Sequence, residues 1–485
     1  MKTKNKHTES INPHIVSEIV DHGLCLRCGA CEPACPFDII RFDEEAYPYI
    51  TNEAACPVNC KRCLKICPGE TVDFAALDKE MFGVSPHYQS VTGIVRRSLV
   101  TFSTDEQLRS TATSGGFTTQ LLEYMMQRGY IDGALVLGSV SDEEGWREKA
   151  FIARSPTELR SAIKSKYRLV PYLRPLKEIE EVDGRYAVVG LPCHIHALKK
   201  YLKSTHKLKK RIVLTIGLYC NVAFEPKVYD ELCEINGVQK KDIKHLDFRA
   251  GHWPGTILAT LQDGTNTKVL KAEEMRDEFN LLKMFYAPER CNMCIDFSAE
   301  YADIAVGDPW LRGRPDGDFI FSDGRTGVIT RTEIGDRMVQ EAAEAGLIRV
   351  EEISIKTFMV NWERAARYKR AFVPQNIKIL RRLGRKVPDY NRPLPKGTVI
   401  EFIQTFVKFF NYRLAKYKWY RMMGLRVFQT KAALAYFRWN RNKKAEKFIK
   451  ALPKMERFFE AYGPPPPKSL QEPASRPIQP DSHVI

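Results

Sequence analysis

Four cysteines near the N-terminus share a spacing that is typical of iron–sulfur proteins. Cys25, Cys28, Cys31 and Cys35 follow the pattern C-x2-C-x2-C-x3-C, and Pro36 comes next. Three thiolates two residues apart can bind three corners of one four-iron cluster, whereas the fourth thiolate is directed toward a neighbouring cluster. The run therefore predicts two clusters, one bound by its first three cysteines and the other by its fourth.

A second cysteine run follows the first and is also closed by a proline. Cys56, Cys60, Cys63 and Cys67 precede Pro68, but three residues instead of two separate the first pair. A one-residue bulge would absorb this insertion and keep Cys56 as a ligand. We expect one cluster to be bound by Cys25, Cys28, Cys31 and Cys67, and the other by Cys35, Cys56, Cys60 and Cys63.

Zinc is the alternative to iron for these eight thiolates, because zinc also accepts four cysteines. Two complete runs, each followed by a proline, favour iron–sulfur clusters. Disulfides are disfavoured because the spacing is tight and regular and the first residues, MKTKNKHTES, contain no apolar export signal. Two clusters in such a module would carry single electrons rather than perform catalysis.

Four further cysteines predict a third cluster in the body of the chain. Two of them each follow an apolar segment that reads as a strand, at the position where parallel sheets build sites, and the other two form a C-x2-C pair. These cysteines are Cys193, Cys220, Cys291 and Cys294. Asp296 could replace one thiolate, and Cys233, inside a helical stretch, is expected to be a core residue.

A glycine-rich segment opens a helix in the body. Thr113, Ser114, Gly115 and Gly116 lie at the expected start of this helix. Backbone amides at a helix start bind anions such as a pyrophosphate, and glycines allow the anion to approach closely. Short Gly-Gly helix starts are also common as structural turns, so both interpretations stay open.

The segments that must position these residues alternate between strands and helices. Short apolar runs predict strands at 95–102, 133–138, 186–190, 212–217, 304–307 and 328–330, and helices are predicted at 116–127, 197–203 and 333–345. This alternation indicates an α/β (α+β) body with a largely parallel mixed sheet. The expected units are a ferredoxin-like domain at 17–85, two body regions at 90–175 and 176–375, a basic helical extension at 376–462, and a disordered Pro-rich tail at 463–485.

Seven segments, in this order, resemble the beta subunits of coenzyme F-420 hydrogenases and dehydrogenases. They are TSGGF at 113–117, SKY at 165–167, GLPCHIHAL at 190–198, GLYC at 217–220, RAGHWPG at 249–255, CNMCID at 291–296 and ADIAVGDPW at 302–310. With the cysteine-rich module, the resemblance covers about residues 20–370. It implies an FAD held by the body, a cubane cluster nearby, and a flat redox substrate stacked on the flavin. In characterised relatives this substrate is coenzyme F-420, and another branch reduces chlorophyll derivatives.

The resemblance also implies roles for individual residues. Residues 113–116 would hold phosphate. Lys166 would offer a positive charge to phosphate or to the reduced flavin, unless it is a solvated surface lysine. His194 and His196 flank the expected site as proton donors or as hydrogen-bond anchors, and Trp253 would line the flavin or substrate pocket or lie in the core.

We therefore expect an iron–sulfur flavoprotein that passes electrons between F-420 and one-electron carriers. FAD would stand between them, because F-420 carries hydride, the clusters carry single electrons, and a flavin handles both. Two alternatives stay open: a ferredoxin-dependent reductase of another conjugated substrate, and a non-catalytic electron-transfer subunit. Each implies a redox partner protein, such as a ferredoxin, a hydrogenase or another component of a reductase.

Composition excludes several classes of protein. With 44 % hydrophobic and 28 % charged residues among 485, the chain is not mainly disordered. Stretches without Asp, Glu, Lys or Arg are short: the longest, at 81–95, holds 15 residues, and 212–224 holds 13. A membrane span needs about 20. Because no export signal is present, we expect the protein in the cytoplasm, with the inner membrane face as an option.

The net charge of +16 is concentrated near the C-terminus, where residues 361–460 hold 26 Lys and Arg against 6 Asp and Glu. Within 396–460 the ratio is 16 to 4, and an apolar helical face is expected at Ile400, Ile403, Val407, Phe410, Leu414 and Tyr417. Three interpretations stay open: a structural cover for the body, a docking surface for an acidic redox partner, and attachment to an anionic membrane surface. Nothing in the redox segments indicates nucleic acid.

Overall fold

The computed structural model describes residues 13–84, 92–142, 145–251, 255–270, 275–309, 324–355, 362–394, 398–436 and 439. Trp253, most of residues 437–462 and the predicted tail at 463–485 lie outside these residues. In the part of the chain that the structure describes, no helix has the length and apolar character needed to cross a bilayer.

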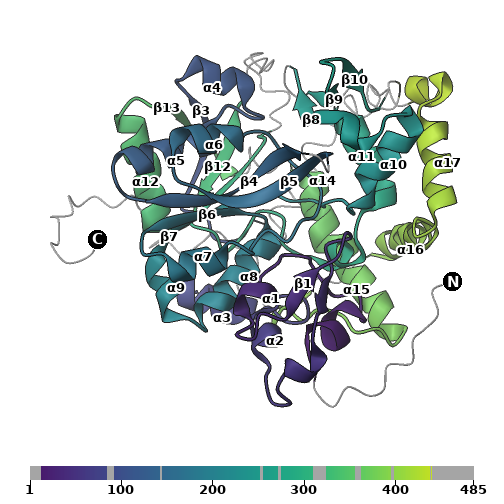
Figure 1. Cartoon of the computed structure of the whole chain (residues 1–485), viewed down its shortest axis with the longest axis horizontal. Helices are drawn as coiled ribbons and strands as arrows, with labels where there is room; N and C mark the ends of the chain where they lie inside the picture. The colour runs from purple at the N-terminus through teal and green to yellow at the C-terminus, as the bar shows by residue number, and fades with distance from the viewer. Residues whose placement is uncertain are drawn as a thin grey trace.

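An eight-stranded sheet forms the centre of the molecule (Figure 1), in the order β13-β3-β12-β11-β7-β6-β4-β5. All six strands predicted from the sequence are present in it, as β3, β4, β6, β7, β11 and β12. The strands are β3 (Arg97–Ser103), β4 (Gly133–Asp142), β5 (Gly145–Ala153), β6 (Tyr186–Gly190), β7 (Ile212–Leu218), β11 (Ile304–Gly307), β12 (Thr326–Thr330) and β13 (Ile348–Glu352).

The predicted largely parallel arrangement is wrong outside the centre of the sheet. β4, β6, β7 and β11 pair in parallel, whereas β5 on one side and β12, β3 and β13 on the other pair antiparallel. Only two residues separate β4 from β5. Such a connection is too short for a crossover, so the pair must be antiparallel. Because β5 mixes charged and apolar side chains, its sequence alone predicts no strand.

Helices cover both faces of the sheet (Figure 1). One apolar core contains Phe117, Leu159 and Met338 from α5, α6 and α12. The core on the opposite face contains side chains from α7, α8 and α9 together with the cysteine-rich module. The helices are α4 (Glu106–Thr111), α5 (Phe117–Gln127), α6 (Pro156–Ser161), α7 (Leu176–Glu181), α8 (Pro192–Leu202), α9 (His206–Arg211) and α12 (Glu333–Glu344).

The helix predicted at 197–203 begins five residues earlier than expected, because Pro192 occupies the first position of α8. A proline is tolerated there since the first turn of a helix leaves its N–H groups unbonded in any case. Cys193, His194 and His196 therefore lie in the first turns of a helix and not in a loop.

The cysteine-rich module is built from short elements. They are η1 (Val16–Val20), α1 (Cys31–Ala34), β1 (Ile40–Phe42), β2 (Pro48–Ile50), η2 (Glu53–Ala55), α2 (Arg62–Ile66) and α3 (Phe74–Phe82). The module is joined to a distant part of the chain by backbone hydrogen bonds. Val72 N–H donates to Asp389 O at 2.9 Å, and Phe74 N–H donates to Tyr390 O at 3.0 Å. The module is therefore continuous with the body.

A smaller lobe carries a three-stranded antiparallel sheet in the order β10-β9-β8, with the C-terminal helices at its outer edge (Figure 1). Its core includes Leu282, Phe285 and Leu425. The lobe contains α10 (Lys227–Asn236), β8 (Ile243–Ala250), β9 (Thr256–Leu261), β10 (Asn266–Lys268), α11 (Met275–Tyr286), α16 (Val399–Leu414) and α17 (Lys418–Phe428). The remaining elements are η3 (Lys240–Asp242), η4 (Glu289–Met293), α14 (Glu363–Arg367), η5 (Tyr368–Phe372) and α15 (Val373–Arg382).

A buried ion pair fastens α17 to this lobe. Arg421 donates from Nε to Glu231 Oε2 at 2.9 Å, and the same carboxylate oxygen accepts from the Tyr286 hydroxyl at 2.7 Å. Both charged side chains are almost fully buried, at 4 % and 6 % exposure. An anion left alone in such surroundings is costly, so each partner depends on the other.

We expect Arg421→Met to weaken the attachment of α17, because it leaves the Glu231 carboxylate buried without its cation. The free energy for opening α17, measured by amide hydrogen exchange, should fall by about 3–5 kcal/mol. Arg426→Met, on an exposed position of the same helix, is the matched control and should change it little. Equal exchange rates in the two variants would contradict this account of the ion pair.

Candidate functional site

Four strands of the central sheet end at one edge. β3, β11, β7 and β6 run in the same direction, because β3 and β11 are both antiparallel to β12, and β7 and β6 are parallel to β11. Asp308, Cys220 and Cys193 follow the carboxyl ends of β11, β7 and β6. The turn at 113–116 lies at the end of β3, where Ser103 N–H donates to Gly115 O at 2.7 Å. Parallel sheets bind ligands at this kind of edge.

The structure brings the four body cysteines together at this edge. Burial raises the pKa of the Cys193 thiol, and electrostatic repulsion from Cys220, Cys291 and Cys294 raises it further. Burial is also the main reason that the pKa of Cys220 is raised to about 12. Repulsion of this kind requires short distances between thiols. The four side chains therefore converge, as expected for a site with four thiolate ligands.

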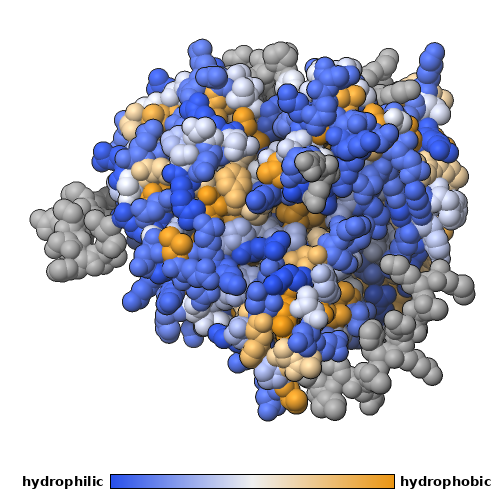
Figure 2. All heavy atoms as spheres, viewed as in Figure 1, coloured by the Kyte–Doolittle hydropathy of each residue, from blue (hydrophilic) through white to orange (hydrophobic). Residues whose placement is uncertain are grey.

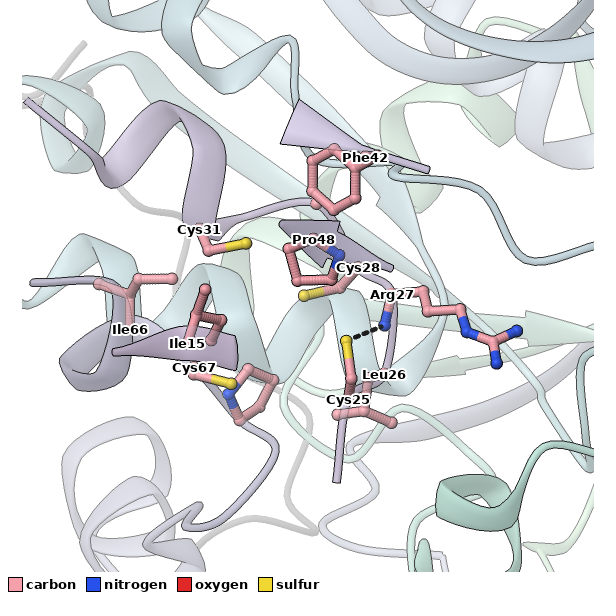
Figure 3. Close-up of a pocket in the computed structure, with 12 residues that line it drawn as sticks. Ile15, Cys25, Leu26, Arg27, Cys28, Cys31, Phe42, Pro48, Ile66 and Cys67 are labelled. Atoms are coloured by element: carbon pink, nitrogen blue, oxygen red, sulfur yellow. Dashed lines mark hydrogen bonds between the residues drawn. The ribbon is translucent and has the colours of Figure 1, made fainter. Parts of the chain in front are cut away.

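Four cysteines of the N-terminal module line a pocket, and Figure 3 shows their sulfur atoms turned toward a common space. These cysteines are Cys25, Cys28, Cys31 and Cys67. Arg27 N–H donates to Cys25 Sγ and Gly69 N–H donates to Cys67 Sγ, each at 3.3 Å. Burial, and then repulsion from Cys67, raises the pKa of Cys25 to about 12. The grouping matches the set predicted for the first cluster.

The second cysteine run is compact despite its extra residue. Cys60 N–H donates to Pro57 O at 2.9 Å, so the inserted residue is taken up in a hydrogen-bonded turn. Burial is the main reason that the pKa of Cys63 is raised to about 11, and Cys56 and Cys60 add to the effect. Cys35 is half-buried at the end of α1 and packs against the same core as Cys63. Cys56 therefore lies near Cys63, as does Cys60.

The donors of these groups suit either kind of metal site. A four-iron cluster takes four thiolates, and zinc accepts four thiolates as well. Among the described residues, no three His, Cys, Asp or Glu side chains are placed to hold one metal ion. The assignment of these thiolates to iron–sulfur clusters stays a prediction.

A short segment connects the first N-terminal group to the body cysteines. Leu173 N–H donates to Cys28 O at 2.8 Å. The adjacent Tyr172 ring stacks on the His194 ring, with centroids 4.5 Å apart and planes at 9°. His194 directly follows Cys193, and Cys28 contributes to the raised pKa of Cys193. The two sets of cysteines are therefore neighbours, and residues 171–173 lie between them.

The two histidines predicted as proton donors or anchors are both buried. Burial lowers the pKa of His194 to about 3, so its ring is neutral. Its Nδ1 accepts the Leu191 N–H at 3.2 Å, which places the ring proton on Nε2. His194 Nε2 has no hydrogen-bond partner among the described residues. This geometry presents a fixed N–H donor, and proton donation by either histidine stays a prediction.

His196 is paired with Asp296, so the carboxylate is already engaged. His196 Nε2 lies 3.0 Å from Asp296 Oδ2, and both side chains are buried. The same carboxylate accepts the backbone N–H groups of Ser298 at 3.0 Å and Glu300 at 3.1 Å. Burial is the largest single influence and raises the pKa of Asp296, but the hydrogen bond and charge of His196, the Glu300 N–H and the charge of Arg331 together outweigh it, so the pKa is lowered. Asp296 thus fastens α8 to the segment after Cys294, and replacing a thiolate would break these bonds.

Two buried cations that the sequence did not single out face the body cysteines. Lys369 is 1 % exposed, and its pKa is raised because attraction to Cys294, Cys220 and Cys291 outweighs its burial. Arg290 is 3 % exposed and donates to Gly69 O at 3.0 Å and to the Tyr390 hydroxyl at 2.9 Å. Nothing in the local sequence around Lys369 distinguishes it from the other lysines of a basic region. Only the packing shows that it lies beside thiols.

Motifs far apart in the sequence meet at the turn of residues 113–116. Ser165 N–H donates to Thr113 Oγ1 at 2.9 Å. The Ser114 hydroxyl donates to Asp308 Oδ1 and to Arg325 O. The other oxygen of Asp308 accepts from Arg249 Nη1 at 2.6 Å. In the sequence Asp308 and Arg249 stand only inside longer motifs, and the structure identifies them as the side chains that join those motifs.

The glycines of the turn are required by the turn itself. Gly115 and Gly116 have φ angles of +76° and +74°, where residues with a Cβ are strained. A Cβ on Gly116 would also lie 3.0 Å from Leu108 Cγ. Lys166 Nζ donates to three backbone carbonyls, among them Ile163 O at 2.8 Å. Burial lowers the pKa of Lys166 to about 8, and its role toward phosphate or flavin stays a prediction.

We expect Cys193→Ser to remove one cluster and Cys233→Ser to remove none. Cys193 belongs to the body group, whereas Cys233 packs in the core of the smaller lobe. Anaerobically purified protein should contain about twelve irons per chain, and the Cys193→Ser variant about eight. Iron and sulfide analysis of both variants checks this. A Cys193→Ser protein that keeps all its iron would show that the body cysteines hold no cluster.

Comparison with known proteins identifies the family. The beta subunit of coenzyme F-420 hydrogenase/dehydrogenase matches the chain in two adjoining regions, its N-terminal part at residues 99–177 and its C-terminal part at residues 183–356. A 4Fe-4S binding domain matches at residues 18–41, which include the first cysteine run.

Relatives of known sequence share about a quarter to a third of their residues with this chain. The chain is 28 % identical to the coenzyme F-420-dependent sulfite reductase of Methanocaldococcus jannaschii, over 70 % of this chain and 49 % of that protein. It is 28 % identical to one of the subunits of the F(420)H(2) dehydrogenase of Methanosarcina mazei, over 68 % and 87 %. An uncharacterized protein of M. jannaschii is 30 % identical, over 52 % and 85 %. The chain thus spans about half the length of the sulfite reductase and most of the other two.

Among solved structures, the chain is similar to a chain of the F-420-reducing NiFe hydrogenase complex of Methanosarcina barkeri, with a TM-score of 0.47, 21 % identity, and coverage of 63 % of this chain and 97 % of that chain. The matched regions at 99–177 and 183–356 contain the turn, the body cysteines and Asp308. Together with the 30 % identical relative, of which this chain covers 85 %, they show the family. The chain belongs to the family of coenzyme F-420 hydrogenase/dehydrogenase beta subunits and carries a 4Fe-4S binding domain near its N-terminus.

Proposed function

We propose that this protein is an iron–sulfur flavoprotein that passes electrons between coenzyme F-420 and a one-electron redox partner. The observation that carries the proposal is the contact between the two cysteine groups, through Cys28, residues 171–173 and Cys193. Electrons that reach the body site can leave only if a second carrier lies nearby. The first N-terminal cysteine group is placed to hold that carrier.

The proposed order of electron carriers follows the arrangement of the cysteines. The body group Cys193, Cys220, Cys291 and Cys294 would hold the cluster next to the flavin. The group Cys25, Cys28, Cys31 and Cys67 would hold the second cluster, and Cys35, Cys56, Cys60 and Cys63 the third. Cys63 contributes to the raised pKa of Cys31, which supports the proximity of the last two groups. The third cluster would be the one that a partner protein reaches.

The flavin would lie at the sheet edge between the turn of residues 113–116 and the body cysteines. Bound FAD supplies the conversion between a hydride and single electrons. Backbone amides at the start of α5 would face its phosphates. Asn221 Oδ1, directly after Cys220, is buried and has no hydrogen-bond partner among the described residues, so it fits an N–H donor of a bound group. His194 Nε2 offers the complementary N–H. Trp253 stays part of the proposal as a pocket residue.

Turnover with F-420 tests the proposal. Anaerobically purified holoprotein should contain one flavin per chain and should oxidise reduced F-420 while reducing a viologen dye, two dye molecules for each hydride. NADH in place of F-420 is the control and should give no dye reduction. Protein without flavin would instead be an electron-transfer subunit. Flavin-containing protein that accepts electrons from ferredoxin but never reacts with F-420 would act on a different conjugated substrate.

Lys369 generates a prediction about the body cluster. A buried cation stabilises the more negative, reduced cluster, so Lys369→Met should lower the midpoint potential of one cluster. One unit charge at about 8 Å in an effective dielectric constant of about 20 corresponds to about 2 kcal/mol. The expected shift is on the order of 50–100 mV for a one-electron couple.

Redox titration followed by electron paramagnetic resonance measures this shift. Arg381→Met, at an exposed position of α15, is the matched control and should leave every potential unchanged. Iron analysis of both variants verifies that the clusters are retained. An unchanged set of potentials in iron-replete Lys369→Met protein would remove Lys369 from the cluster environment.

A further inference from the structure

Helix α16 exposes an uninterrupted apolar face. Ile403, Val407 and Phe410 are 57 %, 65 % and 53 % exposed, although they belong to the face that the sequence predicted as apolar. Residues at steps of three, four and seven lie on one side of a helix. The exposed members of this face are Val399, Ile403, Phe406, Val407, Phe410, Leu414 and Tyr417. We call these seven residues the α16 face.

Helix α17 continues this exposure. Trp419, Met423 and Val427 are spaced four apart and are all exposed, at 61 %, 48 % and 54 %. The two helices follow each other at the outer edge of the molecule (Figure 1). The exposed apolar residues of the two helices recur at helical spacing, unlike the scattered apolar residues that a monomer usually shows.

The structural-cover interpretation explains only the opposite sides of these helices. On α16, Thr405 is buried, and Asn411 Nδ2 donates to Met284 O of α11 at 2.8 Å. On α17, Met422 and Leu425 are buried in the core of the smaller lobe. Those contacts attach the helices to the body. This attachment does not account for the exposure of the α16 face.

Positive charge accompanies the apolar face. Residues 398–436 contain seven Lys and Arg but one acidic residue, Glu401. Some of these cations are used internally, since Lys418 pairs with Glu234 and Arg421 with Glu231. In the described part of the chain, Arg413, Arg426 and Lys431 have no carboxylate partner. The next residues, 437–460, add eight Lys and Arg against three Glu.

We propose that the α16 face and the exposed side of α17 lie on the surface of an anionic lipid bilayer, with both helices in the plane of the membrane. The aliphatic and phenylalanine side chains would enter the boundary between head groups and acyl chains. Tyr417 and Trp419 suit the interface because each combines a flat apolar ring with a polar group. Arg413, Arg426 and Lys431 would face anionic head groups.

A lipid surface fits this face better than a protein does. Protein interfaces carry about one hydrogen bond for each 100–200 Å². Among the seven side chains of the α16 face, only the Tyr417 hydroxyl can form one. Binding to a bilayer requires no such hydrogen bonds, because the acyl chains accommodate apolar side chains of any shape. The experiment must therefore distinguish binding to an anionic bilayer from binding to an acidic protein partner.

Vesicle flotation of the full-length holoprotein tests the proposal. Vesicles of phosphatidylcholine mixed with phosphatidylglycerol should bind the protein, phosphatidylcholine vesicles should bind it less, and added salt should release it from the anionic vesicles. The triple variant Ile403→Ser, Val407→Ser, Phe410→Ser should bind at least about tenfold more weakly. Arg413→Gln, Arg426→Gln, Lys431→Gln should lose the preference for anionic lipid.

Matched controls keep the test decisive. Tyr49→Ser, Val182→Ser, Leu383→Ser removes three exposed apolar side chains elsewhere and should bind like the unaltered protein. Iron content and thermal unfolding should be equal in all variants. The proposal is overturned if the unaltered protein ignores anionic vesicles or if the α16 variant still binds them. It is also overturned if the α16 variant changes the oligomeric state, or the binding of an acidic ferredoxin, instead of vesicle binding.

Discussion

The guanidinium of Arg290 is the contact on which the redox architecture depends. It is buried and donates to Gly69 O and Pro68 O, directly after Cys67, and to the Tyr390 hydroxyl. Tyr390 in turn donates to Met293 O, between the two cysteines of the C-x2-C pair. One side chain therefore fastens the N-terminal module, the body cysteine segment and the chain after α15. Without it, the carbonyls of Pro68 and Gly69 would lose this buried donor, at a cost of about 1–3 kcal/mol each.

The same region shows how a protein prepares to bury negative charge. Burial raises the pKa of the Cys25 and Cys220 thiols to about 12, so apolar packing alone would keep them protonated. Thiolates in such surroundings need bound metal or cations beside them. Lys369 and Arg290 supply fixed positive charge near the body group, and backbone N–H groups reach sulfur in the N-terminal group. The face of the molecule seen in Figure 2 is mostly hydrophilic, with scattered hydrophobic residues.

Strand direction explains why residues as far apart in the chain as Ser114 and Asp308 meet. Because β3, β11, β7 and β6 all end at one edge, the segments that follow them are neighbours. Asp308 then joins Ser114 to Arg249, and Thr113 accepts from Ser165. A redox site at this edge can therefore be built from residues that follow several strands. The N-terminal module packs against α8 on one face of the sheet.

Local spacing determined much of this protein from sequence alone: the cysteine sets, the six apolar strands, the α5 turn and the unequal distribution of charge. Each depends on residues a few positions apart. The antiparallel flanks of the sheet, the pairing of His196 with Asp296 and the position of Lys369 depend on segments that meet only after folding, so no local pattern predicts them. The α16 face shows the same limit. The periodic apolar residues of α16 could be predicted from the sequence. Only the packing of Thr405, Met422 and Leu425 decided which side of helices α16 and α17 faces outward.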